Sequence, residues 1–178
     1  MALTKVISGG QTGVDRAALD VAFALGFEIG GWCPKGRLAE DGTIPDAYPL
    51  WETRSEELHV RTQRNVESST ATLIVSRGAL YGSTRFTAEC AASMRRPLLV
   101  VDLTCDLRDP VEDIALWLRQ VRPTVLNVAG PRESGAPGIY DGAMQVLTAA
   151  FQTFNASSEL VRAPTALTSR SDLSHVAL

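Results

Sequence analysis

The sequence predicts an α/β protein with a doubly wound parallel sheet of five main strands and helices on both faces. Short apolar runs alternate with segments whose apolar residues recur at helical spacing, from residue 3 to about residue 154. This alternation is typical of parallel sheets, because each parallel strand needs a crossover connection. Three loops rich in glycine follow strands, at 9–16, 77–84 and 130–138. Because the carboxyl ends of parallel strands meet at one edge, these loops predict a ligand site there.

The five expected strands are short apolar runs bounded by turn residues. They are Leu3–Ile7, Phe27–Trp32, Ala71–Ser76, Pro97–Leu103 and Thr124–Ala129. The third of them is apolar almost throughout, which is typical of a central parallel strand that is buried on both faces.

The expected helices cover residues 17–25, 55–68, about 83–95, a segment that begins at Asp109, and about 139–154. Gly26 is a C-cap candidate for the first helix. Asp109 followed by Pro110 is a strong helix start, because Asp caps free N–H groups and Pro suits the first helical position. Residues 155–178 are rich in Ser, Thr, Ala and Arg without periodicity. We therefore expect one domain over 1–154 and a tail with little regular structure over 155–178.

The loop after the first strand has the residue types of an anion-binding turn. Its glycines let the backbone approach a ligand closely, and the helix that follows favours negative charge at its N-terminus. Side chains in the loop add further donors. The candidate ligand-binding residues here are Gly9, Gly10, Gln11, Thr12, Gly13 and Arg16. A tight strand-to-helix turn without a ligand is the alternative.

Basic residues gather in the loops although the chain is acidic overall. The net charge is −3, which argues against extended nucleic-acid binding. Many of the cationic side chains stand next to glycines, in loops or at helix starts, where they could receive a small anion. The remaining candidate ligand-binding residues come from these loops: Lys35, Arg37, Arg77, Gly82, Ser83, Thr84, Gly130, Arg132 and Ser134.

Two further segments leave alternatives open. Residues 33–42 begin a long irregular stretch, which is either a functional wall of the site or a covering loop. On the helix at 55–68, Arg61, Arg64 and Asn65 share a face with apolar residues. They either point towards the site or form a solvated face.

Composition limits the other classes of function. No apolar stretch approaches the length of a membrane span, and the three cysteines lack metal-ligand spacing. The two histidines are far apart in the sequence. We therefore expect a cytoplasmic protein with no metal site, no membrane contact and no nucleic-acid partner.

Three motifs together resemble the SLOG superfamily, a Rossmann-like group of nucleotide-binding proteins. The motifs are Gly-Gly-Gln-Thr-Gly-Val-Asp at 9–15, Trp-Cys-Pro-Lys-Gly-Arg at 32–37 with Glu40-Asp41-Gly42, and Asn-Val-Ala-Gly-Pro-Arg-Glu-Ser at 127–134. They are similar to the circularly permuted YpsA branch, which is also described as molybdenum cofactor carrier proteins. The resemblance covers about residues 3–154. It implies a Rossmann-like sheet in which the strand at 124–129 lies between those at 3–7 and 71–76, with the order 2-1-5-3-4.

The resemblance implies two functions. One is carriage of a phosphate-bearing ligand, either molybdenum cofactor or a nucleotide, without catalysis. The partners would then be the ligand, further copies of the chain in a dimer or tetramer, and molybdoenzymes that receive the cofactor.

The other implied function is N-glycosidase or phosphohydrolase activity, as in the "lonely guy" enzymes. Those enzymes use a helical Arg, which Arg64 matches, and a Glu three residues after a loop Thr. Here Thr87 holds that position and Glu89 lies two residues further on. If the protein is an enzyme, the catalytic candidates are Asp15, Arg64 and Glu89. A nucleotide-sensing module is a third alternative.

Overall fold

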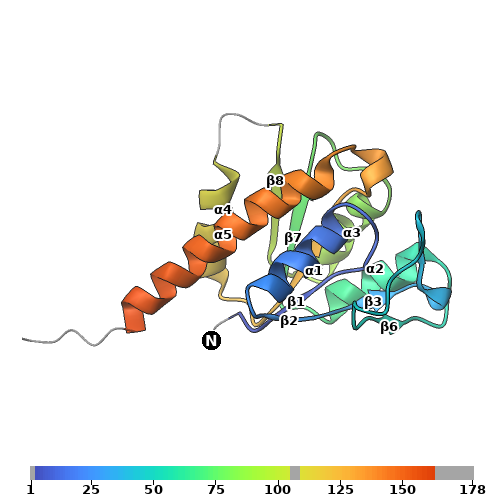
Figure 1. Cartoon of the computed structure of the whole chain (residues 1–178), viewed down its shortest axis with the longest axis horizontal. Helices are drawn as coiled ribbons and strands as arrows, with labels where there is room; N and C mark the ends of the chain where they lie inside the picture. Colours follow the sequence, from blue (N-terminus) through green and yellow to red (C-terminus); the bar gives the residue numbers. More distant parts are fainter. Residues whose placement is uncertain (1–2, 105–108, 163–178) are drawn as a thin grey trace, which may run out of the picture.

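A five-stranded parallel sheet forms the centre of the computed structural model, which describes residues 3–104 and 109–162 (Figure 1). Its strands are β1 (Lys5–Ile7), β2 (Glu28–Gly30), β7 (Ala71–Ser76), β8 (Leu98–Asp102) and β9 (Val125–Ala129). Neighbouring strands follow the order β2-β1-β9-β7-β8. Counted along the chain among these five, this is 2-1-5-3-4, so the predicted order is confirmed.

Strand β9, the last in the chain, lies in the middle of the sheet. Leu126 pairs with Val6 of β1 on one side, and Val128 pairs with Leu73 of β7 on the other. Both pairings are parallel. The loops that follow β1, β7 and β9 therefore leave the sheet at one edge and side by side, which is the arrangement that a shared site needs.

Helices cover the sheet in two groups. They are α1 (Val14–Ala24), α2 (Leu58–Glu67), α3 (Gly82–Ser93), α4 (Pro110–Val121) and α5 (Ile139–Arg162). Helix α5 packs against both α1 and α4, whereas α2 and α3 pack against each other (Figure 1). The main core lies between the sheet and the first group. Its fully buried side chains include Val6, Val14, Leu73, Ile114, Leu118, Leu126, Leu147 and Phe151.

The segment between β2 and α2 has more structure than expected. The predicted strand at 27–32 divides at Gly31, where φ is +129° and a Cβ would lie 2.1 Å from the carbonyl oxygen of Ser8. Two small sheets follow. One pairs β3 (Trp32–Cys33) with β6 (Trp51–Glu52) in parallel, and the other pairs β4 (Leu38–Ala39) with β5 (Gly42–Thr43) in antiparallel fashion. A 3₁₀ turn, η1, spans Lys35–Arg37.

The helix ends confirm one prediction and correct another. The Asp109 side chain accepts hydrogen bonds from the N–H groups of Val111 and Glu112, at 2.9 and 3.4 Å, and so caps α4 as predicted. The last helix continues to Arg162 instead of ending at Phe154. The expectation of little regular structure is therefore wrong for 155–162, and residues 163–178 lie outside the described part. Within that part, no helix has the length and apolar character needed to cross a membrane.

Candidate functional site

Residues from all three glycine-rich loops line one cavity of about 440 Å³ at the carboxyl edge of the sheet. The loop at 9–16 contributes Gln11, the loop at 77–84 contributes Gly82 to Thr84, and the loop after β9 contributes Gly130 to Arg132. The start of α2 forms the remaining wall. Other lining residues are Leu58, His59, Arg61, Tyr81 and Phe86. The volume lies in the range of small-molecule sites, which is roughly 300–1,000 Å³.

The first loop uses its backbone donors internally. The N–H of Gln11 donates to Asp15 Oδ2 at 3.3 Å, and the N–H of Thr12 donates to Gln11 Oε1 at 3.0 Å. The N–H of Val14 donates to the carbonyl of Pro131 at 3.3 Å. This turn joins α1 to the loop after β9, and the N–H groups of Gln11, Thr12 and Val14 already have partners within the protein.

Gly13 lies where the first and third loops touch. Its φ is +74°, and a Cβ there would lie 2.5 Å from the carbonyl oxygen of Pro131. A Gly13→Val variant would therefore force the two loops apart and could not serve as a test of binding alone. This residue is therefore needed for loop packing, because both its backbone conformation and its surroundings exclude a side chain.

The start of α3 is open to the cavity. No side-chain hydrogen bond caps this helix, and Gly82, Ser83 and Thr84 in its first turn line the cavity. The first N–H groups of a helix have no partner within the helix, and its dipole favours an anion there. The hydroxyl of Tyr81 donates to the carbonyl of Gly135 at 2.7 Å and ties this loop to the third one.

A buried ion pair joins a lining residue of the cavity, Arg61, to Asp15 behind it. Arg61 Nη1 lies 3.1 Å from Asp15 Oδ2, and the two residues are only 7% and 3% exposed. The guanidinium lies across Gly9, where a Cβ would approach Nη1 to 1.8 Å. Arg61 Nε is buried and has no hydrogen-bond partner among the described residues. Burial raises the pKa of Asp15 above its usual value, although the charge of Arg61 opposes this shift.

The polar residues of helix α2 divide into a buried face and an exposed face. Arg61 and Asn65 are buried, and the Asn65 side chain bonds to the N–H and carbonyl of Trp32, at 2.8 and 2.9 Å. Arg64 lies on the exposed side, 3.5 Å from Glu67. The charged site residue that the sequence-based choice missed is thus Arg61, and the choice also lacked the lining residues Leu58, His59, Tyr81, Phe86 and Pro131. The spacing of four between Arg61 and Asn65 was the available signal, because residues four apart share a helix face.

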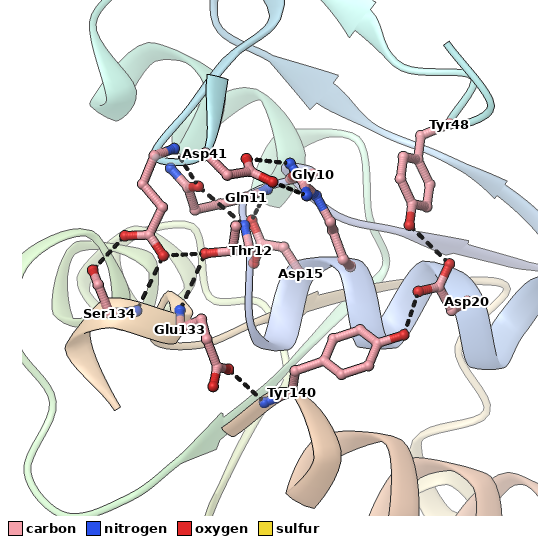
Figure 2. A network of polar contacts seen from close by, with 12 residues as sticks. Gly10, Gln11, Thr12, Asp15, Asp20, Asp41, Tyr48, Glu133, Ser134 and Tyr140 are labelled. Atoms are coloured by element: carbon pink, nitrogen blue, oxygen red, sulfur yellow. Dashed lines mark hydrogen bonds and ion pairs between the residues drawn. The ribbon is translucent and has the colours of Figure 1, made fainter. Parts of the chain in front are cut away.

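Residues 38–43 form a short arm that rests on the first and third loops. In Figure 2, Thr12, Glu133 and Ser134 lie close to one another below this arm. The Glu40 carboxylate accepts hydrogen bonds from the hydroxyls of Thr12 and Ser134. Asp41 binds both terminal nitrogens of Arg16, at 2.6 and 2.8 Å. None of residues 33–42 lines the cavity, so this segment braces the loops from outside instead of forming the cavity wall.

Several predicted ligand-binding residues have other contacts. Arg16 Nε donates to the carbonyl of Gly10 at 3.1 Å in addition to its ion pair with Asp41. Arg37 donates to the four carbonyls of Ile44, Pro45, Tyr48 and Leu50, and so organises the loop at 44–50. Lys35 lies exposed in η1.

Three residues singled out on the second loop and α3 also lie away from the cavity. Arg77 donates to the carbonyl of Pro137 at 2.7 Å. Glu89 lies 2.8 Å from Arg85. Thr87 is buried, and its hydroxyl donates to the carbonyl of Ser83 at 2.9 Å. None of the three lines the cavity.

Asp20 is a further polar centre that the sequence pattern did not reveal. Its carboxylate accepts hydrogen bonds from the hydroxyls of Tyr48 and Tyr140, at 2.9 and 2.8 Å (Figure 2). Burial and these bonds raise the pKa of each phenol to about 12. The cluster joins α1 to the loop at 44–50 and to the start of α5, which strengthens the packing next to the first loop.

Comparison with known proteins identifies the family. Residues 6–151 match the circularly permuted YpsA SLOG family. The chain belongs to this family. The family match spans the sheet, all three loops and most of α5, so it includes the whole cavity. No curated protein matches the chain.

One solved structure is similar to this member of the circularly permuted YpsA family. It is a protein from Syntrophus aciditrophicus named "Putative molybdenum carrier protein". The two sequences are 43% identical, and the match covers 84% of this chain and 95% of the other, with a TM-score of 0.79. Among the described residues, no group of three or more His, Cys, Asp or Glu side chains could hold a metal ion.

Proposed function

We propose that this protein binds a small phosphate-bearing ligand, molybdenum cofactor or a nucleotide, in the cavity between the three loops and α2, and carries it without chemical change. The observation that carries the proposal is the position of Arg61. Its buried guanidinium lines the cavity and is held by Asp15, so it presents a fixed positive charge that an anionic ligand would neutralise. The name of the similar Syntrophus protein supports molybdenum cofactor as the cargo.

The anionic end of the ligand would lie at the start of α3, near Arg61. No side chain caps either helix, but the N–H groups of Gln11, Thr12 and Val14 already bond to Asp15, Gln11 and Pro131, whereas Gly82, Ser83 and Thr84 at the start of α3 line the cavity. Of the two anion positions that the sequence suggests, Gly10–Gly13 and Gly82–Thr84, the second therefore has the better donors. We place the phosphate there, where the helix dipole and Arg61 act together.

The apolar and aromatic part of the cavity lining suits a planar ring. Leu58, His59, Tyr81 and Phe86 form this part, and the rings of His59 and Phe86 meet edge to face with centroids 6.2 Å apart. Aromatic and aliphatic walls of this kind bind heterocycles by stacking and by burial of apolar surface. A pterin or a nucleobase would both fit this chemistry.

Thermal unfolding tests the proposal. Purified protein is heated with molybdenum cofactor, nucleoside monophosphates or ADP-ribose, and Arg61→Gln is compared with Arg64→Gln. A ligand at about 100 times its Kd stabilises a protein by about 2.7 kcal/mol, so a bound ligand raises the melting temperature measurably. We expect the shift to be lost in Arg61→Gln and retained in Arg64→Gln. Equal shifts in both variants, or no shift in the unmodified protein, would contradict the proposal.

Hydrolysis of the N-glycosidic bond is the alternative function. Such chemistry needs a carboxylate near the anomeric carbon. Among the described residues that line the cavity, none is an Asp or a Glu, and Asp15 is paired with Arg61 behind the wall. We therefore expect incubation with nucleoside monophosphates to release no free base. Base release that disappears in Asp15→Asn or Glu89→Gln would establish the enzyme instead.

A carrier function also needs partners and a compartment. Transfer to molybdoenzymes, assembly into a dimer or tetramer, and a cytoplasmic location all stay predictions. Size measurement of the purified protein and transfer of cofactor to an apo-molybdoenzyme are the direct tests.

A further inference from the structure

The carboxylate of Glu40 lies within a set of donors that suits an anion. The hydroxyls of Thr12 and Ser134 donate to it, the N–H of Ser134 donates at 3.1 Å, and Arg132 Nε lies 3.3 Å away. The Glu40 side chain is only 17% exposed. Partial burial raises the pKa of Glu40, but the hydrogen bonds from Ser134 and Thr12 outweigh it and hold the pKa below its usual value. The residue is therefore ionised at neutral pH.

This donor set adjoins the ligand cavity. Arg132 lines the cavity and also contacts Glu40. Gln11 lines the cavity too, and its Oε1 accepts the N–H of Glu40 at 2.9 Å. Glu40, Thr12 and Ser134 do not themselves line the cavity, but the negative charge of Glu40 lies directly beside its Gln11–Arg132 side.

We propose that Glu40 is a specificity-determining residue: its charge, held beside the Gln11–Arg132 side of the cavity, disfavours a second anionic group there and so restricts the site to ligands with a single phosphate. The inference rests on the proposed function and refines its ligand class. Two hydroxyls, one backbone N–H and a guanidinium are donors that bind a phosphate as well as a carboxylate. A ligand with a second phosphate at this end would have to displace Glu40 or stand beside its charge, and like charges in contact are unfavourable.

The test compares ligands that differ by one phosphate. Affinities for AMP, ADP, inorganic phosphate and pyrophosphate are measured by calorimetry on the full chain and on Glu40→Ala and Glu40→Gln. Glu40→Ala empties the position, whereas Glu40→Gln keeps the shape and removes the charge. Asp41→Asn is the matched control, because it weakens the attachment of the same arm to Arg16 but leaves the Glu40 carboxylate in place. Thermal unfolding confirms that each variant is folded.

We expect the unmodified protein to bind the monophosphate of each pair more tightly. In Glu40→Ala the preference for AMP over ADP should fall by about tenfold, which corresponds to about 1.4 kcal/mol, and Glu40→Gln should shift it in the same direction. Asp41→Asn should leave the preference unchanged. An unchanged preference in both Glu40 variants, or an equal shift in Asp41→Asn, overturns this inference alone. Failure of the unmodified protein to bind any of the four probes also overturns this inference, and failure to bind molybdenum cofactor as well overturns the proposed function.

Discussion

Arg61 of α2 and Asp15 of α1 form a buried ion pair, 3.1 Å between Nη1 and Oδ2, and they can do so because Gly9 between them has no side chain. The pair connects the first loop to the helix that forms the cavity wall. Removing one partner of a buried ion pair costs about 3–5 kcal/mol, because the other charge stays buried without compensation. The guanidinium is thereby held in place before any ligand arrives.

The close approach at Gly9 is the first property to test. Gly9→Ala would bring a Cβ to 1.8 Å from Arg61 Nη1, so the guanidinium must move. We expect a loss of about 1–3 kcal/mol in unfolding free energy, as for other overpacked sites, together with weaker ligand binding. Urea unfolding and calorimetry measure the two effects. Gly30→Ala is the control, because its nearest contact is the flexible end of Lys5 at 3.1 Å, and it should change the stability by less than about 1 kcal/mol. Equal losses in the two variants would show that the Arg61 contact is unimportant.

The charge on Asp15 should make stability depend on pH. Because its pKa is raised above the usual 3.8, the folded protein binds a proton at Asp15 more tightly than the unfolded chain does. The contribution of Asp15 to unfolding free energy therefore falls as the pH rises from about 3.8 through the raised pKa, and is constant above it. Urea unfolding of the unmodified protein and of Asp15→Asn across this range gives that contribution by difference. A difference that rises with pH would mean that the charge of Arg61 outweighs burial.

Arg132 should contribute to binding more than to stability. Its side chain is 58% exposed, so Arg132→Ala should change unfolding free energy by less than about 1 kcal/mol. Loss of a cation at the cavity rim should weaken binding of a monoester phosphate by about tenfold, or about 1.4 kcal/mol. Arg64→Ala removes an equally exposed Arg outside the cavity and should bind normally. Unaltered affinity in Arg132→Ala would place the anion away from this loop.

Arg37 should show the opposite pattern. Its guanidinium serves four carbonyls of the loop at 44–50 and is only 15% exposed. We expect Arg37→Ala to lower unfolding free energy by about 2–4 kcal/mol, because several charged hydrogen bonds are lost at once, with little effect on ligand affinity. Lys35→Ala, at an exposed position nearby, should be neutral in both assays. Weaker ligand binding by a folded Arg37→Ala protein would restore this residue to the site.

Local sequence patterns were sufficient for most of the secondary structure. The apolar run at 71–76 matches β7 residue for residue, and Asp109-Pro110 marks the start of α4, because burial periodicity and capping are properties of neighbouring residues. The central place of β9 could be predicted only through resemblance to a permuted family. Strand order depends on contacts between residues far apart in the chain, and no local pattern records it.

The sequence by itself determined that three glycine-rich loops follow strands and meet at one edge of the sheet. Tertiary structure alone decided which of their polar groups remain available to a ligand. Gly9, Gly10 and Gly13 look like one anion-binding turn in the sequence, yet Asp15, Gln11 and Pro131 already accept N–H groups of that loop and of the start of α1. Arg61 and Arg64 are both arginines and lie less than one helical turn apart in α2. Arg61 is nevertheless buried beside the cavity, whereas Arg64 is exposed. Hydrogen-bond partners and burial are set by residues brought together from distant parts of the chain. The sequence could therefore indicate which edge of the sheet carries the site. Which residues form that site was decided by the packing of α2 against the loops.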